Sequence, residues 1–365
     1  MLVKSEDKPQ TQTSRAPIWQ RFAPSPRRMG MIILALFYTL CLTGGFLAPY
    51  NYRTQSRETP FLPPSRIHFF DARGVFHARP FIYRAKLTDP LNFGYTEDRS
   101  QPFPLQFFVR GEDYEFLGLI PASLHLFGVA ATDKAPRAHV LGTDGLGRDL
   151  LARLLQGGMI SLLVGPLGLL LAYLAGIAIG AAAGWRGGRV DAALMRLAEI
   201  MMSLPTLLLI LAIRASFPLS VTPTQVALMM LTIFTFVGWA EVARLTRGLV
   251  AAERRRDYIA AAIACGASDW RVLLRHILPN IGTPLLVQFA LGVPTYILAE
   301  IALSYLGVGV QEPGASWGGI LAEATELSVL KNYPWMMTPA LFVFFTAMAF
   351  QLLGERENAW SQPEL

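Results

Sequence analysis

Long, nearly uncharged apolar runs dominate the pattern of the chain. They cover Met29–Leu47, Gly157–Gly184, Leu197–Phe217, Gln225–Val242, Ile281–Leu306 and Tyr333–Leu353. An α-helix rises about 1.5 Å per residue, so about 20 apolar residues cross the roughly 30 Å hydrocarbon core of a bilayer. The pattern therefore predicts an all-α membrane protein with six transmembrane helices, the first over 29–48 and the other five within 157–353.

The segment 49–156 between the first two runs has a different character. It is rich in Pro, Arg and aromatic residues and contains no apolar stretch long enough to cross a membrane. Alternating apolar positions such as those of Phe103–Val109 are typical of short β-strands. We expect a large extracytoplasmic insertion with some β-structure between transmembrane helices 1 and 2.

Basic residues predict the orientation of the helices in the membrane. Short loops rich in Lys and Arg stay in the cytoplasm. These residues are Lys4, Lys8, Arg15, Arg21, Arg27 and Arg28 before the first run, Arg186, Arg189 and Arg196 after the second, and Arg244, Arg247, Arg254, Arg255, Arg256, Arg271 and Arg275 after the fourth. The short loops of the opposite side hold only Lys331. Both the tail 1–28 and the tail 354–365 are therefore predicted to be cytoplasmic.

The first apolar run could also belong to a signal peptide. The polar segment before it is long, the run is wide, and it ends in Gly-Gly-Phe-Leu-Ala-Pro without an A-x-A cleavage pattern. These features favour a retained transmembrane anchor over a cleaved signal.

The composition excludes an ordinary soluble protein. The chain of 365 residues is 53% hydrophobic and 16% charged, with a mean hydropathy of +0.38, whereas soluble domains are about a quarter charged. The net charge of +6 would fit nucleic acid, but the basic residues lie beside apolar runs, where they face lipid headgroups instead. The expected contact is membrane lipid, with no nucleic acid.

No enzyme or metal motif is present in the sequence. No lysine follows a glycine as in a phosphate-binding loop, and H-E-x-x-H and G-x-S-x-G are absent. Cys41 and Cys265 lie in unrelated segments, so neither a disulfide framework nor a cysteine metal site is expected. We predict a chain without catalytic or metal-binding residues.

Several residues within the apolar runs are candidates for helix packing or for a transport pathway. Gly176, Gly180 and Gly184 have the four-residue spacing that lets helices approach closely in lipid. Glu300, which follows Pro294, lies deep in the fifth run, and it could line a pathway or join helices.

Other residues of these runs have a structural interpretation. Pro205 predicts a kink in the third helix, and Arg214 is expected to extend from its far end toward water. Glu199 and Glu241 lie near cytoplasmic ends, where pairing with Arg196 or Arg244 is the simpler expectation.

An amphipathic segment follows the fourth apolar run. Arg255–Asn280 reads RRDYIAAAIACGASDWRVLLRHILPN, in which apolar residues recur at helical spacing: Ile259, Ala262, Ile263, Gly266, Trp270, Leu273, Leu274 and Ile277. Gly266 separates two short helices, Ser268 is a candidate N-cap, and His276 is expected near a helix C-terminus. From these residues alone, docking to a cytoplasmic partner and lying on the lipid surface are equally open.

This segment resembles the EAA loop of ABC importer permeases, with a pattern close to E-A-A-x-x-x-G followed by H-x-L-P-N. Ala261, Ala262, Gly266, His276, Leu278, Pro279 and Asn280 match it. His139–Asp149 resembles the H-x-L-G-T-D-x-x-G-R-D signature of the oligopeptide/dipeptide/nickel permeases. Arg153, Gly157, Ser161, Gly165, Gly187, Gly188, Asp191, Ser203, Pro205, Leu303–Gln311 and Ser316–Gly318 match further along the chain. The chain is thus similar to the C-type subunit from about Leu141 to the last apolar run.

The resemblance implies a non-catalytic permease domain over 157–353 with a cytoplasmic coupling loop at 254–280. Such a subunit pairs with a second homologous permease, two ATPase subunits that bind ATP and Mg, and an extracytoplasmic solute-binding protein. The implied coupling residues are Asp257, Ala260, Ala261, Ala262, Gly266, Ala267, Arg275, His276, Pro279 and Asn280. The implied location is the prokaryotic cytoplasmic (inner) membrane, and this chain itself needs no cofactor.

Two departures from the family leave questions open. Ala260 stands where the family has a glutamate, and Arg255, Arg256 and Asp257 are candidates to replace its charge. The insertion 49–156 is larger than usual for the family. The substrate could be a peptide, a nickel chelate, an opine or a sugar, and peptides are the family's commonest.

Two alternative functions need no ATPase. A secondary transporter or channel would show charges at the bilayer midplane and inverted repeats with broken helices, neither of which is evident. A membrane-anchored sensor or assembly factor would not need the docking segment. Asp144, Arg148 and Asp149 form a cluster, but without a nucleophile or metal partner a salt-bridged turn is the expected role.

Overall fold

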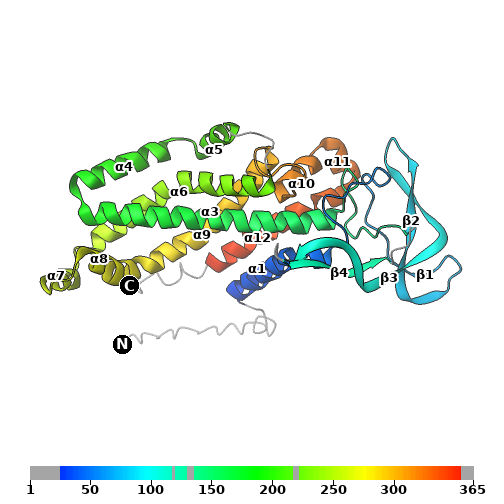
Figure 1. Cartoon of the computed structure of the whole chain (residues 1–365), viewed down its shortest axis with the longest axis horizontal. Helices are drawn as coiled ribbons and strands as arrows, with labels where there is room; N and C mark the ends of the chain where they lie inside the picture. The colour runs from blue at the N-terminus through cyan, green and yellow to red at the C-terminus, as the bar shows by residue number, and fades with distance from the viewer. Residues whose placement is uncertain (1–24, 117–119, 130–134, 217–221, 355–365) are drawn as a thin grey trace, which may run out of the picture.

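The computed structural model describes residues 25–116, 120–129, 135–216 and 222–354. Helices form an elongated bundle with a small sheet at one end (Figure 1). The short helices α7 (Asp257–Ala264) and α8 (Asp269–Val272) lie at the opposite end (Figure 1). The two regions that the sequence singled out, the insertion and the 254–280 segment, therefore lie at opposite ends of the molecule.

Four helices in the described part of the chain are long and apolar enough to cross a membrane. They are α3 (Leu150–Arg186), α6 (Pro223–Glu253), α9 (Leu278–Tyr305, continuous with α8) and α12 (Thr338–Gly354, preceded by the short 3₁₀ helix Pro334–Met337). A fifth span results if the bent pair α4 (Gly188–Ser203) and α5 (Thr206–Ala215) is counted as one. The prediction of six spans is therefore not confirmed.

The first predicted span is shorter than expected. Helix α1 (Pro26–Leu42) has 17 residues, or about 25 Å, and a single turn, α2 (Gly44–Leu47), follows it after Thr43. Two glycines at 44 and 45 weaken the helix at this point. Most of the tail predicted over 1–28 and nearly all of that over 354–365 lie outside the described residues.

The third predicted span is two helices rather than one kinked helix. α4 and α5 meet at 85°, because Pro205 has no N–H to donate and forces the residue before it out of the helical region. Leu204 is accordingly extended, with φ −83° and ψ 137°. The expected position of Arg214 is wrong as well: its side chain is buried and its Nε donates to the Val308 carbonyl at 2.7 Å.

Helices α3 and α6 pack with their backbones almost in contact. A Cβ placed on Gly180 would lie 2.3 Å from the carbonyl oxygen of Ala243, and one on Gly176 would lie 2.5 Å from the Cβ of Val242. Gly184 approaches the Arg247 carbonyl in the same way, at 2.8 Å. Helix α6 extends beyond the predicted end at Val242, so Arg244 and Arg247 belong to the helix rather than to a loop.

The insertion contains a four-stranded antiparallel sheet in the order β1–β2–β3–β4. The strands are β1 (His68–Phe70), β2 (Phe76–Asp89), β3 (Gly94–Phe116) and β4 (Ile120–Val129). The strands predicted around Phe103–Val109 are part of β3, where Phe107 pairs with Phe127 of β4. The protein is therefore not all-α. The predicted boundary between the insertion and the second helix, at Gly157, also differs, because α3 begins at Leu150.

Two further helices, α10 (Trp317–Ala324) and α11 (Leu327–Asn332), lie between α9 and α12. Trp317 is fully buried and its Nε1 donates to the Leu154 carbonyl of α3 at 2.9 Å. Gly318 packs on α9, where a Cβ would meet the Ile301 carbonyl at 2.1 Å. This segment fastens α9 and α3 together near the sheet end of the bundle.

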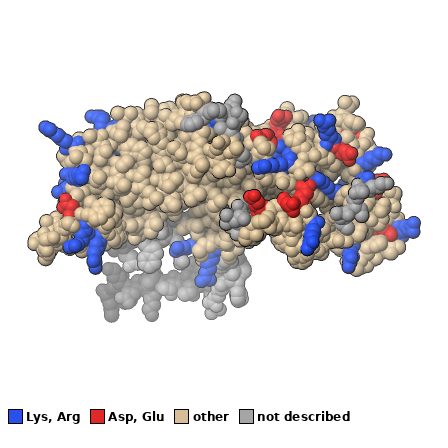
Figure 2. All heavy atoms as spheres, in the orientation of Figure 1, with Lys and Arg blue, Asp and Glu red and all other residues tan. Residues whose placement is uncertain are grey.

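Charge follows the same long axis. On the face seen in Figure 2, Lys and Arg gather at the end that carries α7 and α8, most of the middle is uncharged apart from basic side chains at its lower edge, and the sheet end carries both signs. A band without charges between two charged ends is what a bilayer requires of the helices that cross it.

The close approach of α3 and α6 at Gly180 can be tested by substitution. Gly180→Ala places a methyl group against the Ala243 backbone, which cannot move aside, so we expect a loss of about 1–3 kcal/mol, the usual cost of overpacking. Gly248→Ala, on α6 with open space around it, is the matched control and should not destabilise. Thermal unfolding in detergent measures both, and equal midpoints for the two variants would contradict the close contact.

Candidate functional site

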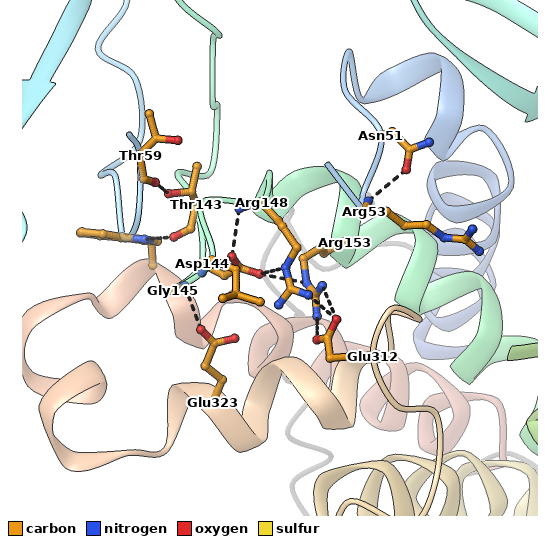
Figure 3. Close-up of polar contacts among 12 residues, drawn as sticks. Asn51, Arg53, Thr59, Thr143, Asp144, Gly145, Arg148, Arg153, Glu312 and Glu323 are labelled. Carbon is orange, nitrogen blue, oxygen red and sulfur yellow. Dashed lines mark hydrogen bonds and ion pairs between the residues drawn. The ribbon is translucent and has the colours of Figure 1, made fainter. Parts of the chain in front are cut away.

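A tight turn, Thr143–Asp149, joins the insertion to α3 (Figure 3). The Asp144 carboxylate accepts the backbone N–H groups of Leu146 and Arg148 at 3.0 and 2.9 Å. Gly147 has φ +70°, and a Cβ there would lie 2.1 Å from the Ser56 carbonyl. Only glycine fits this position without strain, so the spacing of the G-R-D motif has a steric origin.

Two buried arginines and two carboxylates meet beside this turn (Figure 3), and we call them the junction network: Asp144, Arg148, Arg153 and Glu312. Asp144 Oδ2 lies 2.7 Å from Arg148 Nε and 3.2 Å from Arg153 Nε. Glu312 accepts from Arg153 Nη2 at 2.8 Å and also pairs with Arg148. Because Glu312 lies between α9 and α10, the network links the turn before α3 to the loop after α9.

The acids around the network differ in their proton affinity. Partial burial of Glu312 opposes its ionisation, but the hydrogen bonds and charges of Arg153 and Arg148 outweigh this and lower its pKa. Glu323 on α10 accepts the Gly145 N–H at 2.8 Å, and burial, followed by the charge of Asp144, raises its pKa. Of these two acids, Glu312 is therefore the one that ionises more readily.

The expected salt-bridged turn is confirmed for Asp144 and Arg148, but Asp149 has a different partner. Its carboxylate contacts His139 Nδ1 at 2.8 Å and caps α3 by accepting the Ala152 N–H at 2.8 Å. Glu312 could not be predicted from the sequence, since no pattern relates it to arginines more than 150 positions earlier. The one sequence feature that distinguishes Glu312 is its place beside Pro313 in an otherwise apolar stretch.

The 254–280 segment forms the opposite end of the molecule. Asp257, Ala260, Ala261 and Ala262 lie on α7, Gly266 and Ala267 form the turn, Arg275 and His276 lie in the π-helical turn η2 (Leu273–Ile277), and Pro279 and Asn280 begin α9. Gly266 has φ +82° with open space around it, which favours glycine for its backbone rather than its size. Ser268 is the N-cap residue of α8, although its hydroxyl makes no capping bond.

The apolar stripe of this segment divides into two groups. Ile259, Val272, Leu273 and Ile277 are buried against Trp185, Val250 and neighbouring residues of the bundle. Ile263, Trp270 and Leu274 remain exposed, and Trp270 is 70% exposed. The segment is thus fixed to the bundle on one side and leaves an apolar surface uncovered on the other.

Polar contacts hold α7 to the neighbouring helix ends. The Tyr258 hydroxyl donates to Glu253 at the end of α6 and accepts from Asn280 Nδ2 at 2.7 Å. Arg256 lies 3.6 Å from Glu253. Ala260, where the family has a glutamate, is exposed on α7. The single carboxylate on α7 is that of Asp257, the first residue of the helix. Glu253 supplies the anchoring carboxylate from the preceding helix.

The expectation that His276 ends a helix is wrong. α8, η2 and α9 form one continuous helix, Asp269–Tyr305. The Leu278 N–H bonds to the Leu273 carbonyl, one residue further back than in an α-helix. This wider turn, just before Pro279, lets the helix continue past a residue that has no N–H to donate.

The acids of the apolar runs lie in different surroundings. Glu300 is fully buried on α9, where Ser304 Oγ donates to it at 2.8 Å and accepts the Val310 N–H at 3.1 Å. Glu199 pairs with Arg196 at 3.3 Å as expected, whereas Glu241 is exposed and makes no ion pair with any described residue. Pro294 is half-buried within α9, one turn before the contact of Ile297 with Gly165 of α3.

No group of three or more His, Cys, Asp or Glu side chains suited to a metal ion occurs in the parts of the chain that the structure describes. Both cysteines are free, Cys41 buried and Cys265 exposed.

Comparison with known families gives two matches. The family described as "Binding-protein-dependent transport system inner membrane component" matches residues 176–363. The family described as "N-terminal TM domain of oligopeptide transport permease C" matches residues 16–64. The first match begins within α3 and covers the helices that follow, with the 254–280 segment. The second covers α1 and the start of the insertion.

Similar proteins carry related names. The oligopeptide transport system permease protein OppC of Bacillus subtilis (strain 168) is 37% identical over 235 residues, which are 64% of this chain and 74% of that protein. The dipeptide transport system permease protein DppC of the same organism is 37% identical over 228 residues, 62% of this chain and 69% of that protein. The glutathione transport system permease protein GsiD of Pectobacterium atrosepticum is 35% identical over 228 residues, 62% of this chain and 73% of that protein.

Among solved structures, the MetNI methionine ABC transporter in an inward-facing conformation aligns with 57% of this chain and 96% of its own chain. The TM-score is 0.42 and the identity 16%.

The junction network generates a prediction about pH. Glu312→Gln removes one of the two carboxylates that face Arg148 and Arg153, and we expect a loss on the order of 1 kcal/mol at pH 7, because Glu312 is itself 55% exposed and screened by water. Since folding lowers the pKa of Glu312, its contribution is present above about pH 4.5 and is lost as the pH falls through the lowered value. The difference in thermal midpoint between wild type and variant should therefore shrink below pH 4.5.

Glu199→Gln, in the exposed pair with Arg196, is the control for this titration and should change the midpoint little at any pH. A wild-type advantage over Glu312→Gln that stays constant from pH 7 into the acid range would contradict the role of the Glu312 charge.

Proposed function

The chain belongs to the family of binding-protein-dependent transport system inner membrane components, and from this premise we propose that it is the permease subunit of an ATP-driven importer. It moves peptides, or a related small solute, inward across the prokaryotic cytoplasmic membrane. The peptide assignment is supported by the names of its relatives, which are oligopeptide, dipeptide and glutathione transport system permeases. Both termini lie in the cytoplasm in this proposal, which fits the basic residues around α7 and α8.

The observation that carries the proposal is the exposed apolar surface of the 254–280 segment. Ile263, Trp270 and Leu274 are uncovered at the basic end of the bundle, although their neighbours are firmly packed. An aromatic side chain beside smaller apolar groups is typical of the centre of a protein interface. We assign this surface to an ATPase subunit, of which two serve the complex, one on this chain and one on a second homologous permease.

The continuous helix Asp269–Tyr305 supplies a mechanism. Its 37 residues span about 55 Å, so it joins the docking surface to the sheet end of the bundle. At its far end, Glu300 and Ser304 hold the loop that begins at Leu306, and Glu312 in that loop pairs with Arg148 and Arg153. Movement of α8 by a closing ATPase dimer is thereby passed to the extracytoplasmic junction.

The remaining roles are distributed among the partners. ATP and Mg bind to the ATPase subunits, and this chain contributes no catalytic residue. An extracytoplasmic solute-binding protein delivers the substrate to the face that carries the sheet. The buried Glu300 acts in holding the end of α9 to the following loop rather than in binding substrate, because Ser304 engages one of its carboxyl oxygens and no solvent reaches it.

Trp270→Ala tests the docking surface. Truncating a central interface aromatic costs about 2 kcal/mol or more, roughly 30-fold in affinity, while a residue 70% exposed contributes little to folding. We expect weaker co-purification of the ATPase and lower transport-coupled hydrolysis with an unchanged thermal midpoint. The assay uses the full chain co-expressed with its neighbouring permease and ATPase genes and reconstituted in liposomes.

Leu91→Ala is the matched control, because Leu91 is a large apolar residue, 90% exposed, at the opposite end of the molecule. It should leave ATPase binding and hydrolysis at wild-type levels. If Trp270→Ala behaves like Leu91→Ala, the surface is not the ATPase site. If the chain purifies alone and takes up solute without any ATPase, a secondary transporter replaces the proposal.

A further inference from the structure

His125 occupies an unusual place between the sheet and the first helix. It lies on β4 and is only 2% exposed. The β3–β4 hairpin reaches back from the sheet toward α1 and α2 (Figure 1). Ring atom Nδ1 lies 2.9 Å from the Gly45 carbonyl oxygen of α2, and Nε2 lies 2.9 Å from the Glu112 carbonyl oxygen of β3. One imidazole thus bridges two segments that are 67 positions apart in the sequence.

The partners of this ring determine its protonation. A carbonyl oxygen can only accept a hydrogen bond, so each ring nitrogen must donate. Neutral imidazole carries a single N–H, and its second nitrogen would turn a lone pair toward a carbonyl oxygen. Both bonds exist together only in the imidazolium form.

The surroundings are shaped to hold the ring. A Cβ on Gly111 would lie 2.7 Å from His125 Cδ2, and a Cβ on Gly45 would lie 2.2 Å from the Tyr114 ring. The Tyr114 ring centre is 5.0 Å from that of His125. Side chains at either glycine would prevent the hairpin from closing onto α2, so the close approach is built into the chain.

Two cavities, of about 540 and 410 Å³, lie beside His125, and Tyr50, Glu112 and His125 line both. The other titratable or charged groups that line them are Cys41, Tyr52, Arg53, Asp113, Tyr114 and Glu115 in the first and Arg110 and Arg137 in the second. The Glu112 carboxylate is engaged elsewhere, by the Asn51 N–H, Thr54 and Arg137. Among the described residues no carboxylate pairs with His125, so the two carbonyl groups are the hydrogen-bond partners of its ring.

We propose that His125 is a proton-binding site that fastens the sheet to the end of the first helix. With its second proton bound, the ring joins α2, β3 and β4 beside the two cavities that it lines. When the proton leaves, one of the two bonds is lost, and the hairpin is released from α2. Histidine is the side chain whose unperturbed form changes charge between about pH 5 and 8. This side of the molecule faces the medium outside the cytoplasm in the orientation proposed above. The chemistry of the bridge itself does not depend on the transport function.

Hydrogen–deuterium exchange of the full chain in lipid nanodiscs tests the inference. Rates for peptides covering 43–48 and 108–127 are compared at about pH 5.5 and about pH 8, after correction for the pH dependence of chemical exchange, with α6 peptides as an internal reference. We expect corrected rates at least about fivefold higher at the higher pH, the effect of losing one hydrogen bond to a charged group. The α6 peptides should show no such change.

Two variants make the result specific to this residue. His125→Gln can donate only from its single amide nitrogen, and its amide oxygen is an acceptor that cannot bond the second carbonyl group, so it should exchange rapidly at both pH values. His77→Gln changes an exposed histidine of the same sheet that pairs with Asp71, and it should keep the wild-type pH dependence.

Three outcomes would overturn the proposal. They are equal corrected rates at both pH values in the wild type, a pH dependence that survives in His125→Gln, and a pH dependence that disappears in His77→Gln. Should His125→Gln fail to fold, the wild type and His77→Gln still test the proposal, because both are expected to show the pH dependence.

Discussion

The backbone contact between α3 and α6 is the constraint on which the rest of the molecule depends. Lipid gives no hydrophobic drive for helices to associate, so close packing must hold them, and Gly180 brings α3 within contact of the Ala243 carbonyl. The same helix meets α9 through Gly165 and the loop before α10 through Gly157. α3 is therefore the helix around which the others pack. The turn that precedes it places the junction network at one end of the bundle.

The continuous helix from α8 through α9 gives this static bundle a means of transmitting movement. A wide turn before Pro279 keeps the helix unbroken where a proline would otherwise interrupt it. Glu300 and Ser304 then attach its far end to the loop that carries Glu312. The ion pairs of Glu312 with Arg148 and Arg153 then connect this loop to the turn that begins α3.

Much of this organisation could be predicted from local pattern. Apolar runs located α3, α6, α9 and α12, and alternation around Phe103–Val109 indicated strands, because helix and strand periodicity are properties of neighbouring residues. The spacing of Gly176, Gly180 and Gly184 indicated a helix contact for the same reason. The motifs around His139–Asp149 and Asp257–Asn280 led to the family that the comparisons later showed.

The sequence by itself thus determined which segments are helical and apolar, where the charges lie and which family the chain resembles. Only the tertiary structure decided that α4 and α5 meet at 85° and that the bundle buries part of the apolar residues of the 254–280 segment. It also decided that Glu312 faces Arg148 and Arg153, and that His125 lies between two carbonyl groups. Each of these depends on segments far apart in the chain meeting in space. Periodicity tells which residues share a face, but the partner of that face is fixed by packing.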